Sequence, residues 1–287
     1  MNTGAKQAVI ETTEKTEEAA EEAVRNPFIK SFSRFGFYAK GALFLVIGVF
    51  GIFLTAGIRG GKITDPIGAM SAVAQVPFGK PLLIVFILGA LGHGMWNILR
   101  GAADVDNAGT GFKGIIARIA SVGIGIFYFV LAVTAAYVVF SSPVPKTSGE
   151  VEETLTAILL AIPYGAIFVF FIGLGFFAAA GHESYSGITG KFRDNYKNWE
   201  INPSLNRLVF ILGSVSFSVR ALIYLLIGYF FLRAAWMSDP KQAEGLDGAL
   251  LALAQNQFGG ILLTLASIGL ICHGVLAFFE AKYRRVS

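Results

Sequence analysis

The stretch GFYAKGALFLVIGVFGIFLTAGI, residues 36–58, decides the fold of this chain. It holds one charged side chain, Lys40, in a run long enough to cross a bilayer, which takes about 20 apolar residues in a helix. None of the apolar runs in the chain carries the polar face that a soluble helix needs. We therefore predict an all-α integral membrane protein with six transmembrane helices, near 36–58, 81–102, 117–140, 161–181, 208–234 and 259–281.

Composition supports the same class. Hydrophobic residues make up 54% of the 287-residue chain and charged residues only 15%, against about 25% in a soluble domain. The net charge of +4 is small and the basic residues are dispersed, so nucleic acid is not an expected partner. The single cysteine, Cys272, excludes an intrachain disulfide and a C-x-x-C pair. The three histidines lack the spacing of a metal site, so neither a metal nor another cofactor is predicted.

Lys and Arg near the span ends gather on the side that includes both termini. The positive-inside rule then places the N- and C-termini in the cytoplasm. Residues 1–33 form a polar, glutamate-rich tail, and 188–207 form a cytoplasmic linker rich in aromatic and basic residues. In that linker Phe192, Tyr196 and Trp199 recur at helical spacing, which predicts a short helix lying among lipid headgroups.

An internal repeat appears when the sequence is shifted by 180 residues. IGAMSAVAQVPFGK (67–80) then aligns without a gap with DGALLALAQNQFGG (247–260). The same shift places Lys40 on Arg220, His93 on His273 and Arg100 on Glu280. The middle third is a weaker copy, in which the cation position is Ile124 and the histidine position is Ala179.

We divide the chain into three two-helix units, 34–106, 107–187 and 208–287. Because each unit crosses the membrane twice, all three point the same way, which predicts a pseudo-threefold arrangement about the membrane normal. Each outer loop has an apolar stretch that leads into an aromatic–glycine pair. We expect a short interfacial helix in each, with the glycine allowing the turn into the next span; these stretches are 67–78, 155–164 and 246–258.

The polar residues inside the spans form the candidate site. Gly89, His93, Trp96 and Arg100 share one helical stripe, and the glycine indicates close helix contact, so the histidine is expected to face the interior. At 1.5 Å per residue, Lys40 and His93 lie at similar depths from the cytoplasmic ends of their helices. The candidate polar layer therefore consists of Lys40, His93, Arg100, Arg220, His273 and Glu280.

Two interpretations of this polar layer stay open. In one, it surrounds the cytoplasmic mouth of a central pathway, since ionisable groups inside a membrane often mark such paths. In the other it is structural: Lys40 and Arg220 snorkel to headgroups, and the histidines bond across helix interfaces. The structural interpretation also pairs Arg220 with Glu280, and Arg100 with Asp104. Elsewhere, His182 and Glu183 are expected to cap the fourth span, with a cytoplasmic acid/base pair as the alternative.

Four segments resemble a known bacterial membrane family. They are RFGFYAKGALFLVIG (34–48), IGAMSAVAQVPFG (67–79), GHGMWNILRGAAD (92–104) and GLICHGVLAFFEAKYRRV (269–286), and the family is catalogued as domain of unknown function 1206. The resemblance implies tandem two-helix units, commonly three, in a bacterial cytoplasmic membrane. It also implies an aromatic residue, often Tyr, at the positions that His93 and His273 occupy here.

No motif of a hydrolase, metalloprotease or nucleotide-binding enzyme is present, so the chain is not expected to be an enzyme. The leading specific hypothesis is permeation of a small solute, ion or proton along the repeat axis. The alternative is a non-catalytic scaffold, or a lipid-binding accessory subunit of a larger complex. The expected partners are the lipid bilayer and membrane proteins that the sequence does not identify.

Overall fold

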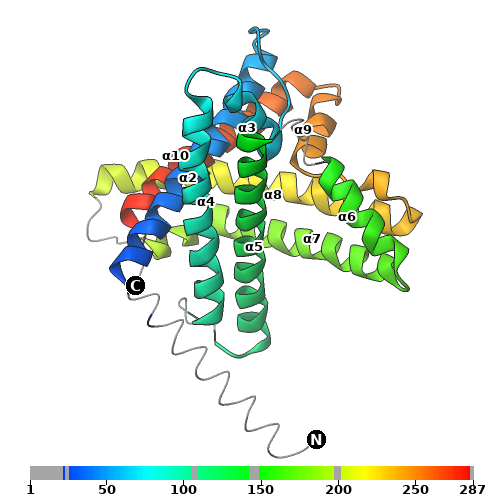
Figure 1. The fold of residues 1–287 in the computed structure, drawn as a ribbon, viewed down its shortest axis with the longest axis horizontal. Helices are drawn as coiled ribbons and strands as arrows, with labels where there is room; N and C mark the ends of the chain where they lie inside the picture. The colour runs from blue at the N-terminus through cyan, green and yellow to red at the C-terminus, as the bar shows by residue number, and fades with distance from the viewer. Residues whose placement is uncertain (1–21, 23–25, 105–108, 142–148, 197–201, 285–287) are drawn as a thin grey trace, which may run out of the picture.

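The computed structural model describes residue 22 and residues 26–104, 109–141, 149–196 and 202–284; most of the predicted acidic tail lies outside them. The described chain is built from helices (Figure 1). Six are long and apolar enough to span a membrane, as predicted. They are α2 (Pro27–Thr55), α4 (Gly79–Ala102), α5 (Phe112–Phe140), α7 (Gly165–Thr189), α8 (Pro203–Met237) and α10 (Gly259–Tyr283).

The fourth span differs from the predicted range at both ends. Helix α7 begins at Gly165 and continues to Thr189, where Gly190 adopts a left-handed conformation with φ 69°. Its backbone N–H bonds the carbonyl of Ser186, which ends the helix. His182 and Glu183 therefore lie inside α7, and the prediction that they cap it is wrong.

Three short helices occupy the predicted outer loops: α3 (Pro66–Ala74), α6 (Gly149–Ala161) and α9 (Leu246–Ala254). Helix α3 has a clear start signal, since the Asp65 carboxylate accepts a hydrogen bond of 2.6 Å from the N–H of Gly68 and Pro66 fills the first turn. Sequence reasoning predicted these helices from the apolar stretches that lead into aromatic–glycine pairs.

The aromatic–glycine pairs have a different role from the one predicted. The left-handed residues are the aromatic ones, Phe78 (φ 63°) and Tyr164 (φ 64°), and not the glycines that follow. The glycines are needed because a Cβ at Gly79, Gly165 or Gly259 would meet a carbonyl oxygen at the end of the preceding short helix. Close backbone approach, rather than φ, therefore selects glycine here.

The most extensive helix contacts join each second helix to the first helix of the next unit: α4 with α5, α7 with α8, and α10 with α2. Glycine pairs bring the backbones together in each case. A Cβ built on Gly41 would lie 2.8 Å from the Gly274 carbonyl oxygen, and one on Gly125 would lie 2.8 Å from that of Gly94. Small residues at membrane helix interfaces permit this approach.

Packing within the units is uneven. Helices α2 and α4 pack together, as do α8 and α10, whereas α5 and α7 lack a comparable contact in the described chain. The two helix pairs in which the middle unit contacts its neighbours differ in direction. Helices α4 and α5 run down the page, whereas α7 and α8 run across it (Figure 1). The middle unit therefore departs from its neighbours, and a closed pseudo-threefold arrangement stays a prediction.

The aromatic–basic linker differs from the predicted surface helix. It contains a short 3₁₀ turn, Lys191–Asn195, after which Tyr196 is extended. Phe192 and Tyr196 are buried and pack against Val209 of α8 and Leu276 of α10. They therefore lie between these helices and do not face the headgroups. Trp199 lies outside the described residues.

Candidate functional site: a polar layer between the helices

The polar layer is centred on Glu280 of α10. Its carboxylate lies 3.6 Å from Lys40 Nζ of α2 and 2.8 Å from Arg284 Nη1, one turn further along the chain. All three side chains are largely buried. Lys40 therefore does not snorkel to the headgroups, and this ion pair joins the first and third units.

Arg220 of α8 has a second carboxylate partner. Its Nη2 lies 3.0 Å from Glu183 Oε1 of α7 and donates a hydrogen bond of 2.9 Å to the Tyr224 hydroxyl. The predicted pairing of Arg220 with Glu280 is wrong, because α7 brings Glu183 against α8 while Glu280 faces α2. This second ion pair joins the middle and third units.

His273 is buried, with 3% of its surface exposed, at the contact of α10 with α8. Its Nδ1 lies 3.1 Å from Ser216 Oγ, so the two side chains share a hydrogen bond. The ring meets Phe44 of α2 edge-on, with centroids 4.7 Å apart. This histidine therefore faces the interior and bonds across a helix interface, as the structural interpretation predicted.

His93 of α4 is equally buried, at 4% exposure, but aromatic rings cover it. Phe37 and Tyr128 pack edge-on against the ring, with centroids at 4.7 and 4.4 Å. Its Nδ1 has no hydrogen-bond partner in the described chain. Asn97 Nδ2 donates a hydrogen bond of 2.8 Å to the backbone carbonyl of His93 and not to its ring.

The structure brings the predicted residues within electrostatic range of one another, but their partners differ. Lys40, Arg220, His273 and Glu280 lie among paired groups. His93 is enclosed by rings, although Lys40, Arg284 and Arg100 lie near enough to act on it, and Arg100 is half-buried in the last turn of α4. Within the described chain no group of three His, Cys, Asp or Glu side chains could hold a metal ion. Chemically, the layer offers neutralised charges and hydrogen bonds rather than an exposed acid, base or nucleophile.

Sequence reasoning missed three members of this layer: Glu183, Ser216 and Arg284. Arg284 was detectable, because it follows Glu280 by four residues on one helical face. Ser216 falls on Gly36 under the 180-residue shift, so the repeat itself conceals it. Glu183 was missed because the predicted fourth span ended at residue 181, eight residues before the end of α7.

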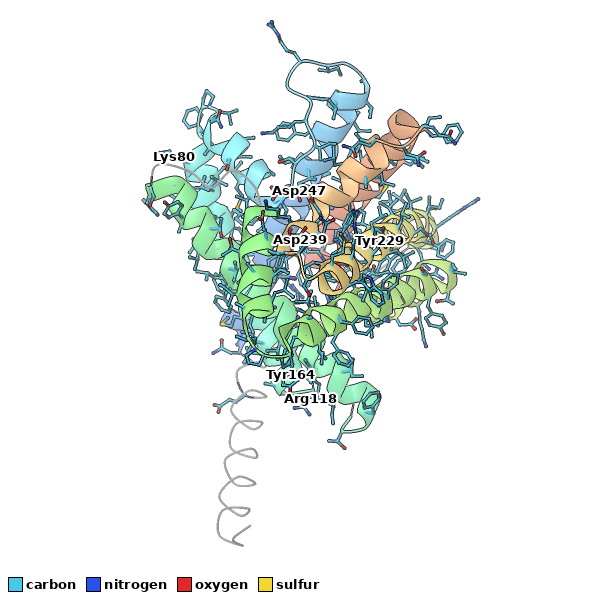
Figure 2. All side chains as sticks on the ribbon, turned by 90° about the vertical axis from the view of Figure 1, so that its right-hand side faces the viewer. Lys80, Arg118, Tyr164, Tyr229, Asp239 and Asp247 are labelled. Carbon is cyan, nitrogen blue, oxygen red and sulfur yellow. The ribbon has the colours of Figure 1, made fainter. Side chains whose placement is uncertain are left out.

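A separate acidic cluster lies at the other end of the spans, where α3, α6 and α9 begin. It contains Asp65, Glu152, Glu244 and Asp247 (Asp247 is labelled in Figure 2). The Glu152 carboxylate packs so closely against Gly245 that a Cβ there would overlap it. Burial, and then the nearby Asp247, Asp65 and Glu244, raise the pKa of Glu152 to about 8. Nothing in the local sequence marks Glu152, since its neighbours come from two other units.

Comparisons with known proteins agree with the repeat. The family described as Domain of Unknown Function (DUF1206) matches two segments, 35–104 and 215–284, which are related by the same 180-residue shift. An uncharacterized protein of Bacillus subtilis (strain 168), YxxB, is 30% identical over 261 residues, covering 91% of this chain and 93% of its own length. No solved structure matches the chain. Because two segments match the family and the relative aligns over nearly its whole length, this multi-pass membrane protein belongs to the DUF1206 family.

Proposed function

We propose that this protein is a non-catalytic scaffold of the bacterial cytoplasmic membrane, with both termini in the cytoplasm, and that its polar layer locks the three units together. One observation carries the proposal: two buried cations are matched by carboxylates from another unit, Lys40 by Glu280 and Arg220 by Glu183. Buried charges that are paired in this way are held in place, because separating them leaves an uncompensated charge in an apolar medium.

The surroundings of the two histidines support the same function. His93 is covered by the rings of Phe37 and Tyr128, and His273 by Phe44 and Ser216. Neither histidine lines the groove beside Ala39 and Leu83, or the one beside Phe170 and Trp236. A scaffold needs such close packing, whereas a pathway needs room for a solute.

Permeation along the repeat axis is the second candidate, favoured by one observation. His93 Nδ1 is buried without a partner, and an unpaired ring nitrogen is able to exchange a proton or bind a passing solute. In this alternative, the rings of Phe37 and Tyr128 act as a gate beside the histidine.

Flux measurements separate the two candidates. The purified protein is reconstituted in liposomes with a trapped pH dye, and collapse of an imposed pH gradient is followed; glycerol entry is followed by light scattering. A scaffold gives the same rates as empty liposomes, and His93→Ala leaves them unchanged. Flux that exceeds the empty liposomes and falls with His93→Ala, but not with His182→Ala at the exposed third histidine, would establish permeation instead.

A further inference from the structure

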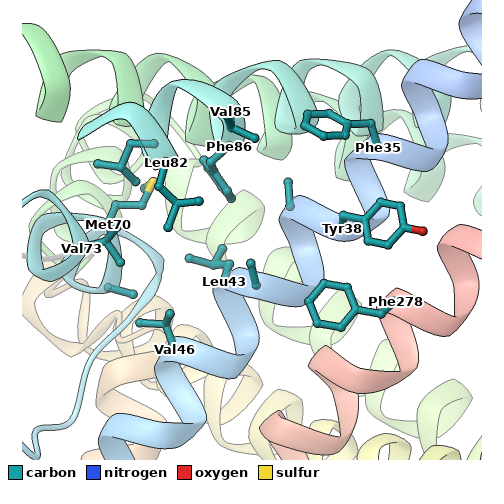
Figure 3. Close-up of a pocket in the computed structure, with 14 residues that line it drawn as sticks. Phe35, Tyr38, Leu43, Val46, Met70, Val73, Leu82, Val85, Phe86 and Phe278 are labelled. Atoms are coloured by element: carbon teal, nitrogen blue, oxygen red, sulfur yellow. The ribbon is translucent and has the colours of Figure 1, made fainter. Parts of the chain in front are cut away.

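An apolar groove opens between α2, α3 and α4 on the outside of the bundle. Its volume is about 250 Å³, and Tyr38 is the one lining residue with a hydroxyl group (Figure 3). Pockets that enclose drug-sized ligands have about 300–1,000 Å³, so this groove has room for part of a hydrocarbon chain but not for a bulky headgroup as well.

Three of the residues that line the groove are alanines. Ala39 and Ala42 of α2 and Ala69 of α3 leave space that larger residues would fill, and the half-exposed Leu82 and Val85 of α4 form one wall. These helices include two candidate membrane spans, so the opening faces lipid tails rather than water. A flexible apolar chain is the ligand that such a surface attracts.

One end of the groove is aromatic and leads to basic residues. Phe35, Tyr38 and Phe278 line this end, and the rings of Tyr38 and Phe278 lie 5.9 Å apart (Figure 3). Helix α2 begins and α10 ends on this side of the groove. Arg34 precedes Tyr38 by four residues and Lys282 follows Phe278 by four, so each cation lies one helical turn beyond its aromatic residue. Two cations therefore flank the end of the groove.

Neither cation forms an ion pair with a carboxylate of the described chain. Lys282 is exposed, and its ammonium lies over the Tyr283 ring at 5.0 Å, so no carboxylate of the described chain occupies that face. Arg34 Nε is buried from solvent yet has no hydrogen-bond partner in the described chain. By contrast, Arg118, which matches Arg34 in the middle unit, uses its Nε to bond the Gly101 carbonyl at 2.7 Å.

We propose that this groove binds an anionic glycerophospholipid, with an acyl chain along Ala39, Ala42 and Leu43 and its phosphate beside Arg34 and Lys282. The apolar part supplies retention, and the two cations supply selection for a negative headgroup. Basic residues at a membrane surface attract anionic lipid, each contributing about fivefold in affinity. This site does not depend on the scaffold proposal, since it lies outside the polar layer.

Native mass spectrometry of the full chain in detergent tests the proposal. Phosphatidylglycerol and phosphatidylcholine of identical acyl chains are titrated separately, and the lipid-bound fraction is measured. We expect phosphatidylglycerol to reach half-occupancy at a concentration at least about tenfold lower than phosphatidylcholine, as two cations predict. The Arg34→Gln/Lys282→Gln variant should bind both lipids alike, while Lys191→Gln, at an exposed cation outside the groove, should keep the preference.

A steric variant tests the acyl-chain part separately. Ala42→Phe places a ring in the groove and should weaken binding of both lipids, whereas Ala178→Phe, at an exposed alanine of α7, should not. Equal binding of both lipids to the unmodified protein would overturn the headgroup assignment. Binding unaffected by Ala42→Phe would overturn the groove as the site. A dimer that disappears with Ala42→Phe, with no bound lipid, would assign the groove to a second copy of the chain instead.

Discussion

His93 and His273 occupy the same register of their repeats, yet the structure gives them different surroundings. Both are buried, and both meet an aromatic ring edge-on at 4.7 Å. His273 shares a hydrogen bond with Ser216, whereas Gly36 stands at the matching position beside His93 and leaves its Nδ1 unpaired. One residue on the facing helix therefore decides whether the histidine has a polar partner.

This difference has a steric origin. A Cβ built on Gly36 would lie 2.6 Å from His93 N and 2.7 Å from the Gly89 carbonyl oxygen, so α2 and α4 approach too closely for a serine. The first unit thus has tight backbone contact, and the third has a hydrogen bond. The repeat preserves the histidines while their roles diverge, and this divergence argues against a working site shared by all units.

The largest expected effect comes from Glu280, which matches Arg100 in the first unit. Glu280→Gln removes the carboxylate between Lys40 and Arg284, and breaking a buried pair costs about 3–5 kcal/mol because the charges left behind are uncompensated. Thermal unfolding in detergent should show the loss. The Lys40→Met/Glu280→Gln double variant should lose less than the sum of the single losses; strictly additive losses would show that the two side chains are not coupled.

A second experiment attempts to make the first unit resemble the third. Gly36→Ser supplies His93 with a hydroxyl group but forces α2 and α4 apart, and such overpacking costs about 1–3 kcal/mol. Gly123→Ser is the matched control, since a Cβ there has no atom within 4 Å. If both variants unfold at the same temperature, close packing at Gly36 is not what separates the two histidine sites.

The reverse change makes the third unit resemble the first. Ser216→Ala leaves His273 Nδ1 unpaired and should lower stability by about 1 kcal/mol, the usual contribution of one buried hydrogen bond. Ser267→Ala should cost less, because the Ser267 hydroxyl bonds the Leu263 carbonyl within its own helix. Equal losses from the two variants would assign no special role to the His273–Ser216 bond.

The effect expected at the acidic cluster depends on pH, because Glu152 has carboxylate neighbours while Glu280 has cationic ones. Since folding raises the pKa of Glu152 to about 8, above its usual value of 4.5, its protonated form is favoured in the folded protein. Stability from this group is fully present below pH about 4.5 and is lost as pH rises to about 8.

Glu152→Gln replaces the carboxyl group with a carboxamide, which is neutral at every pH. The variant should therefore not lose stability as the pH rises. At pH 9 the variant should melt at least about 2–4 °C above the unmodified protein, the shift that 1 kcal/mol produces in a chain of this size. At pH 4, below the ordinary pKa of 4.5, the two should melt together. Glu153→Gln, at the adjacent residue, provides the control, and a melting temperature at pH 9 that does not rise in Glu152→Gln would contradict the raised pKa.

The spans and the repeat could be predicted because their signals are local or self-similar. Apolar length marked all six long helices, and the 180-residue shift that aligned the two histidines also relates the two segments matched by the family. Inward-facing histidines followed from the glycine stripe. The ion pairs could not be predicted in the same way. The sequence offers Arg220 two carboxylate partners, Glu280 of its own unit and Glu183 of the middle unit. Only the packing of α7 on α8 selects Glu183.

The sequence by itself determined that this chain spans a membrane six times and repeats a two-helix unit, because hydropathy and register are properties of the residues in order. The tertiary structure alone decided which polar groups meet. Lys40 and Glu280 stand near opposite ends of the chain, and Ser216 and His273 are 57 residues apart. Their contact depends on how closely the helix backbones approach; a glycine stripe indicates that a helix has a close neighbour, but not which helix that neighbour is.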